Sequence, residues 1–255
     1  MEAGLNLFSL HKLIKEPEEY RETCRKVKEM GYSYAQYSGR ALEPELIRDV
    51  QEEVGLPIVL THVPMDRILD DTQKLMEDHA VFGCRNIGLG GISRSILLDD
   101  EQCKEAMAKL NEAGRVMADN GFKFFYHNHH NEFFKLSNGQ CVIDYMLENC
   151  PYINFTADTY WIQYGGGDVL KYLKKMTGRI GCIHLKDYRI STDADKKLIP
   201  QFAPVGEGNL DFSDIVRVAK EAGTEYFLVE QDDATEYDDP MAQVRSSIDY
   251  IRSVL

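Results

Sequence analysis

Polar side chains that can bind a metal ion or carry a proton recur at regular places in this sequence. Each follows, or ends, a short apolar or aromatic run. They are His62, His127, His129, Asp158, His184, Lys186 and Glu230. A mixture of carboxylate oxygens and imidazole nitrogens suits Mn²⁺, Mg²⁺, Co²⁺ or Zn²⁺ better than a soft metal. These residue types therefore indicate divalent-metal chemistry, provided that the fold brings them together.

The elements that must position these residues alternate between short strands and helical segments. Eight runs rich in β-branched and aromatic residues are predicted as strands, at residues 4–10, 32–37, 57–63, 86–92, 122–129, 153–158, 180–187 and 226–232. Strands that alternate with helices form a parallel sheet, and eight of them close a barrel of roughly 250 residues. The 255 residues are thus predicted to form a single (β/α)8 TIM barrel, with residues 1–255 as one domain.

Helix ends and loops can also be placed from the sequence. Helical segments run up to Gly31, Gly55 and Gly121, and a glycine at that position suits the left-handed residue that ends a helix. Residues 188–211 are predicted to be a long irregular connection after the seventh strand, where active-site loops of such barrels lie.

The predicted barrel brings the polar strand ends to one mouth, because the carboxyl ends of all eight strands share one face. Asp158, His184 and Glu230 together form a candidate metal site. Each has another explanation when taken alone. Asp158 could be only a helix N-cap, His184 a hydrogen-bonded interior histidine and Glu230 a surface carboxylate.

A fourth ligand is expected from the fifth strand, which ends in the sequence YHNHHNEF. His127 and His129 are two residues apart, so both could face the mouth while Asn128 points away. Glu132 follows closely, and the choice among His127, His129 and Glu132 as the fourth ligand stays open on the residues alone.

Composition excludes several classes of protein. The formal net charge of −13 would repel a nucleic acid backbone. Six cysteines with no C-x-x-C pair predict reduced thiols rather than disulfides or a zinc knuckle. Because the sequence has no basic leader and no long apolar run, we expect a cytoplasmic protein that does not enter a membrane.

The order of motifs resembles the sugar phosphate isomerase/epimerase family of xylose isomerase-like barrels, which includes ketose 3-epimerases, hydroxypyruvate isomerase and inosose dehydratase. The resemblance spans nearly the whole chain. It rests on LTHVPM at 60–65, YHNHHNEF at 126–133, ADTYW at 157–161, GRIGCIHLKD at 178–187, FAPVGEGNLDF at 202–212 and LVEQD at 228–232.

The resemblance implies one divalent cation, with Mn²⁺ expected, held by four side chains at the barrel mouth. Asp158, His184 and Glu230 match three of the ligands. Many similar proteins have a glutamate where this chain has His127, and we expect His127 to take over as the fourth ligand. Glu132 is then expected to transfer protons.

The activity implied is isomerisation or epimerisation of a small sugar or keto-sugar through an enediolate. The cation would stabilise the enediolate, and nearby acid–base residues would remove and return the proton. The alternatives are a metal-dependent lyase or dehydratase acting on a keto-sugar or oxidised glycoside, and a sugar-binding barrel without catalysis. The expected substrate is a small carbohydrate, and no cluster of Arg or Lys residues indicates that it carries a phosphate. Homodimers or homotetramers are common in similar proteins. The expected catalytic residues are Glu132, Glu230 and His129, and the expected substrate contacts are His62, Trp161, Lys186 and Glu207.

Overall fold

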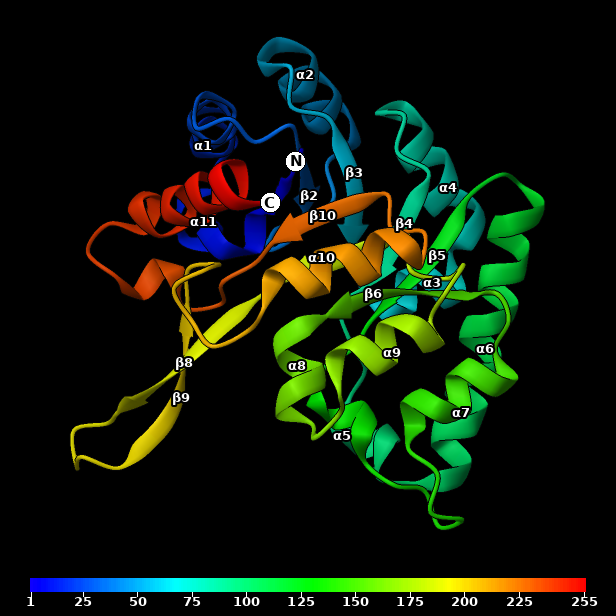
Figure 1. Cartoon of the computed structure of the whole chain (residues 1–255). Helices are drawn as coiled ribbons and strands as arrows, with labels where there is room; N and C mark the ends of the chain where they lie inside the picture. The colour runs from blue at the N-terminus through cyan, green and yellow to red at the C-terminus, as the bar shows by residue number, and fades with distance from the viewer.

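Eight parallel strands close into a barrel in the computed structural model, which describes residues 1–255 (Figure 1). Around the barrel the strands follow the order β1-β10-β7-β6-β5-β4-β3-β2. They are β1 (Gly4–Asn6), β2 (Tyr34–Tyr37), β3 (Ile58–His62), β4 (Asn86–Leu89), β5 (Lys123–His127), β6 (Ile153–Asp158), β7 (Cys182–Leu185) and β10 (Tyr226–Val229). The predicted (β/α)8 TIM barrel is therefore confirmed.

Helices join the strands and cover the outside of the barrel (Figure 1). The α-helices are α1 (Pro17–Glu29), α2 (Pro44–Val54), α3 (Met65–Asp70), α4 (Thr72–Val81), α5 (Arg94–Leu97), α6 (Asp100–Asp119), α7 (Val142–Asn149), α8 (Thr159–Tyr164), α9 (Val169–Lys175), α10 (Phe212–Glu221) and α11 (Pro240–Val254). Three short 3₁₀ helices are η1 (Leu7–Leu13), η2 (His130–Phe133) and η3 (Ala234–Glu236). None of these helices is long and apolar enough to span a membrane.

The glycines predicted to end helices have the expected backbone. Gly31, Gly55 and Gly121 follow α1, α2 and α6 with φ angles of 103°, 71° and 77°. A side chain would be strained at these angles, so glycine lets the chain leave the helix and return to the barrel.

The predicted first strand was too long. Residues 4–10 were predicted as one strand, but β1 ends at Asn6 and η1 begins at Leu7. The Asn6 side chain accepts a hydrogen bond from the Phe8 backbone N–H at 3.1 Å, which turns the chain. Leu7, Ser9 and Leu10 of η1 are buried, so a short apolar run alone could not distinguish strand from helix.

The predicted irregular connection after the seventh strand was also wrong, because it contains a hairpin. β8 (Asp187–Thr192) pairs antiparallel with β9 (Leu198–Ala203) in a separate two-stranded sheet. The hairpin projects away from the barrel (Figure 1). Its turn is held by Asp193, whose side chain accepts the backbone N–H groups of Asp195 and Lys197 at 2.9 Å each.

Asp187 fixes the base of this hairpin. Its buried carboxylate accepts four backbone N–H groups at 2.8–3.2 Å. The donors are Tyr188, Gly206, Gly208 and Leu210. One side chain thus joins the start of the hairpin to the loop that leads into α10.

Replacing Asp187 by Asn is expected to lower the free energy of unfolding by roughly 2 to 3 kcal/mol, because an amide NH₂ would then face backbone N–H donors. Urea denaturation measures this difference. Asp211→Asn is the matched control, since Asp211 also accepts two backbone N–H groups but caps α10 at an exposed position, where Asn serves equally well. Equal losses in the two variants would contradict the role given to Asp187.

Candidate metal centre

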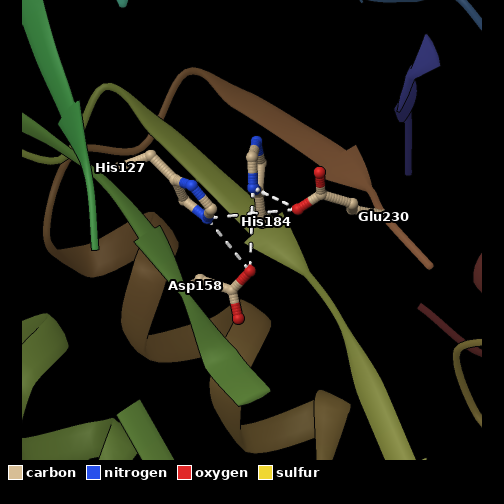
Figure 2. A group of neighbouring side chains, drawn as sticks. All are labelled: His127, Asp158, His184 and Glu230. Atoms are coloured by element: carbon tan, nitrogen blue, oxygen red, sulfur yellow. Dashed lines mark hydrogen bonds and ion pairs between the residues drawn. The ribbon is translucent and has the colours of Figure 1, made fainter. Parts of the chain in front are cut away.

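Four of the predicted site residues converge at the carboxyl end of the barrel. His127, Asp158, His184 and Glu230 come from or directly follow β5, β6, β7 and β10, and all four side chains are buried. One nitrogen or oxygen atom of each lies within 4.8 Å of those of the other three, and Figure 2 shows these atoms pointing to a common point. His127 Nε2 is 3.2 Å from Asp158 Oδ2, and His184 Nδ1 is 2.8 Å from Glu230 Oε2.

The two-residue repeat of a strand directs these side chains into the barrel. A second, smaller core fills the barrel below the site with Tyr34, Leu60, Phe125, Cys182 and Leu228. Residues two positions apart on a strand face the same side. The residue two positions after each core residue therefore also points into the barrel, above the core, and all five of these residues are polar. The resulting residues are Gln36, His62, His127, His184 and Glu230.

Two amide side chains, one from β1 and one from β2, orient two of the candidate ligands. Gln36 Oε1 lies 2.7 Å from His184 Nε2, so that nitrogen carries a proton and Nδ1 is the ring nitrogen that faces the site. Asn6 Nδ2 donates to Glu230 Oε1 at 2.6 Å, which leaves Oε2 towards the site. Neither amide was predicted as a site residue, although both lie near the carboxyl end of a strand and point into the barrel as the candidate ligands do.

Asp158 has both of the roles that the sequence left open. Its Oδ1 atom accepts the backbone N–H of Trp161 at 2.9 Å and caps α8. Its Oδ2 atom faces the histidines. The backbone N–H of Asp158 is in turn bonded to Asn128 Oδ1 at 3.1 Å, so its position is set from two sides.

The four residues fit a divalent cation. His184 Nδ1 and Glu230 Oε2 are buried and make no well-aligned hydrogen bond, although charged groups of the same cluster lie 2.8–2.9 Å from them. Such atoms destabilise a protein unless something satisfies them, and a cation at the common point would satisfy both. Two carboxylates and two imidazoles also form the mixture of hard and borderline donors that first-row divalent metals accept.

Lys186 adds a buried positive charge to this group. Its Nζ atom lies 3.0 Å from Asp158 Oδ2, 2.9 Å from Glu230 Oε2 and 3.0 Å from Asp232 Oδ1. Asp232 was not predicted as a site residue. Its spacing of two positions from Glu230 could have identified it, because residues two apart in an extended chain face the same side.

The pKa values reflect this arrangement of charges. Burial lowers the pKa of Lys186, but the three carboxylates outweigh burial and raise it well above its usual value. Burial raises the pKa of Asp158, but Lys186 and the two imidazoles hold it below the ordinary range. Burial lowers the pKa of His184, and the carboxylates of Glu230 and Asp158 more than reverse this, to about 9.

A cavity of about 690 Å³ opens beside the four residues. Two of the candidate ligands, His127 and Glu230, line this cavity. The predicted residues His62, His129 and Lys186 line it as well. Burial lowers the pKa of His129 to about 3 and that of His62 well below its usual value, and neighbouring histidines add to both shifts. Both imidazoles are therefore neutral at physiological pH.

Two predicted substrate contacts lie away from the lining of this cavity. The Trp161 ring is 5.3 Å from the His129 ring and 5.3 Å from Lys186 Nζ, so it contacts two residues that line the cavity without lining it itself. Glu207 is half-exposed, accepts a hydrogen bond from Ser246 and lies near Arg189.

Glu132 is not brought to the cavity either. Its buried carboxylate accepts the Tyr126 hydroxyl and the His129 backbone N–H, each at 2.7 Å. Tyr126 belongs to the core outside the barrel, so Glu132 lies behind the strand whose end carries His127. Burial raises the pKa of Glu132 to about 7. In this position Glu132 holds the backbone that presents His129.

The closed barrel and its buried cluster at the carboxyl ends of the strands define a barrel with a candidate metal centre. The chain belongs to the xylose isomerase-like TIM barrel family, whose sequence model matches residues 24–254. The resemblance to sugar phosphate isomerase/epimerase proteins is thereby confirmed at the level of the family.

Individual proteins of related sequence or structure carry several names. An inosose dehydratase of Clostridium perfringens is 29% identical over 168 residues, which are 61% of this chain and 56% of that protein. The chain thus spans about half the length of the curated relatives that it matches. A sugar phosphate isomerase/epimerase of Parabacteroides distasonis superposes with a TM-score of 0.83 at 19% identity, over 99% of this chain and 94% of that one. A xylose isomerase-like TIM barrel protein of Mycobacterium smegmatis in complex with magnesium gives 0.72 at 15% identity, over 98% and 94%.

Replacing Glu132 by Gln tests the raised pKa through stability. The pKa of Glu132 is about 7 in the folded protein and its ordinary value is 4.5, so the folded state binds more protons than the unfolded state between these two values. The stability of the wild type relative to Glu132→Gln is therefore greatest below about pH 4.5 and falls by about 3 kcal/mol as the pH rises through 7. Urea denaturation of both proteins across this range measures the difference, and a pH-independent difference would contradict the assignment.

Proposed function

We propose that the chain is a divalent-metal-dependent enzyme that isomerises or epimerises a small sugar or keto-sugar by moving a proton next to its carbonyl group. The observation that carries the proposal is the convergence of two carboxylates and two imidazoles beside a cavity lined by further neutral histidines. Perturbed titratable groups that meet in a concave site are typical of active sites.

The cation would be held by His127, Asp158, His184 and Glu230. When bound there it would polarise a substrate carbonyl and its neighbouring hydroxyl, which would make the proton on the hydroxyl-bearing carbon more acidic. We propose Mn²⁺ because it accepts both oxygen and nitrogen donors. The magnesium complex of the Mycobacterium smegmatis protein supports a divalent cation in this family.

His129 is the residue placed to carry the proton. Its imidazole lines the cavity and is neutral, so a ring nitrogen can accept a proton there, but burial makes it a weak base until negative charge on the substrate raises its pKa. As negative charge develops on the substrate, the protonated imidazole becomes more favourable. The ammonium group of Lys186, held at the cavity wall, would stabilise the same negative charge on a substrate oxygen.

The position of Glu132 bears on the type of reaction. Epimerisation that inverts a carbon uses bases on opposite faces of the substrate, and Glu132 was expected to be the second base. The carboxylate of Glu132 lies behind β5, so the predicted pair of Glu230 and Glu132 does not meet at the cavity. Glu230 and His129, the other two residues expected to be catalytic, both line it.

A dehydratase is the second candidate. The matching Clostridium perfringens protein is an inosose dehydratase, and elimination of water begins with the same removal of a proton next to a carbonyl. His129 and Lys186 would serve this first step equally well. The two reactions differ in whether the product retains the mass of the substrate.

Protein purified without chelator is expected to contain about one divalent cation per chain, as measured by elemental analysis. Asp158→Asn should reduce this content at least tenfold, because the Asn oxygen can still cap α8 but the charge facing the histidines is lost. His184→Ala and His127→Ala should act in the same way, whereas Glu132→Gln should keep the metal. A wild type that takes up no added Mn²⁺ would favour a sugar-binding barrel without catalysis.

Incubation of metal-loaded protein with a panel of aldoses, ketoses and keto-inositols in D₂O is expected to yield a product with unchanged carbon skeleton and oxygen content and up to one added deuterium. His129→Asn should lower the rate by about 10²-fold or more, because the proton carrier is removed. Mass spectrometry also distinguishes the second candidate, whose product lacks one molecule of water.

A further inference from the structure

The ammonium group of Lys186 makes contact with the oxygen atoms that would bind the cation. Its Nζ atom is 3.0 Å from Asp158 Oδ2 and 2.9 Å from Glu230 Oε2. These are the oxygens that face His127 and His184 in Figure 2. Lys186 is 1% exposed, so water cannot screen its charge from either carboxylate. In this arrangement Lys186 neutralises part of the negative charge that the site would present to a metal.

A divalent cation and an ammonium group on the same two oxygens would repel each other strongly in a buried site. Lys186 has another partner available, because Asp232 Oδ1 and Oδ2 lie 3.0 and 3.2 Å from Nζ. Asp232 lines the cavity and is 24% exposed in its side chain, so it marks the direction towards open space.

We propose that Lys186 is a tethered counter-ion, which occupies the cation-binding oxygens of Asp158 and Glu230 in the metal-free protein and moves onto Asp232 when a divalent cation enters. This inference rests on the proposed metal-dependent function. Asp232 is then a positioning residue, because it acts on the metal through Lys186.

The surroundings of Lys186 allow this movement. Its side chain is unbranched, and its Nζ atom lies 5.3 Å from the centre of the Trp161 ring and 5.8 Å from that of Phe202. Aromatic faces attract an ammonium group without fixing its direction, so they stabilise the charge as it changes carboxylate partners. After the movement, the ammonium group remains at the cavity wall, where a substrate oxygen would meet it.

Metal affinity in a double-mutant cycle tests the proposal. The dissociation constant for Mn²⁺ is measured by competition with a chelating dye in the wild type, Lys186→Met, Asp232→Asn and the double variant. Lys186→Met should bind Mn²⁺ about tenfold more tightly, because no ammonium group competes for the oxygens. Asp232→Asn should bind about tenfold more weakly, because Lys186 loses its second partner.

The double variant separates competition from simple charge effects. If Asp232 acts through Lys186, Asp232→Asn has little further effect once Lys186 is Met. If each charge acts independently on the metal, Asp232→Asn weakens binding equally in both backgrounds, which overturns the proposal. Lys123→Met is the matched control, since Lys123 pairs with Glu225 at the opposite end of the strand that carries His127. It should leave the affinity unchanged.

A crystal structure of the metal-loaded wild type gives a second readout that needs no variant. Nζ more than about 3.5 Å from Asp158 Oδ2 and Glu230 Oε2, but still bonded to Asp232, would support the proposal. Nζ still bonded to both ligand oxygens would overturn it. Unchanged affinity in Lys186→Met would overturn this inference alone, whereas a wild type that binds no cation would overturn the proposed function as well.

Discussion

Successive side chains point to opposite faces of each strand, and this alternation fixes which residues can meet inside the barrel. In a closed barrel every second side chain must point inward, and the interior has room for only a few layers. One layer of this chain is filled by a small apolar core around Phe125. The layer above it is polar, and every polar group there needs a partner because water has little access. The convergence of histidines and carboxylates at the mouth follows from this geometry.

Opposite charges hold that polar layer together. Asp158, Glu230 and Asp232 bring three carboxylates to the neighbourhood of one ammonium group, and the site lies in a chain with a net charge of −13. Removing one member of such a buried group destabilises the others, since an uncompensated charge is left in a medium of low dielectric. Amides from the first two strands complete the arrangement, so the site depends on barrel closure and not on the last strands alone.

Much of the fold and most of the site could be predicted from the sequence. The barrel followed from eight apolar runs, and the four converging residues followed from their places at strand ends. The hairpin β8–β9 was missed because few of its residues are buried and it lies outside the barrel. Glu132 was expected at the mouth because it follows His127 closely. The chain turns into η2 between them, however, and directs Glu132 behind the strand onto Tyr126. Asp232 and the two supporting amides were missed because an isolated polar residue at a strand end resembles any surface residue.

The helix cap at Asp158 places the sole tryptophan of the chain beside the candidate metal centre. Trp161 receives its position from the carboxylate that faces the histidines, and its indole ring lies close to the ammonium group of Lys186. Indole emission depends on nearby charge and on local rigidity. The protein therefore contains an intrinsic fluorophore whose signal arises entirely at this mouth, so that binding there can be followed by light emission without a label.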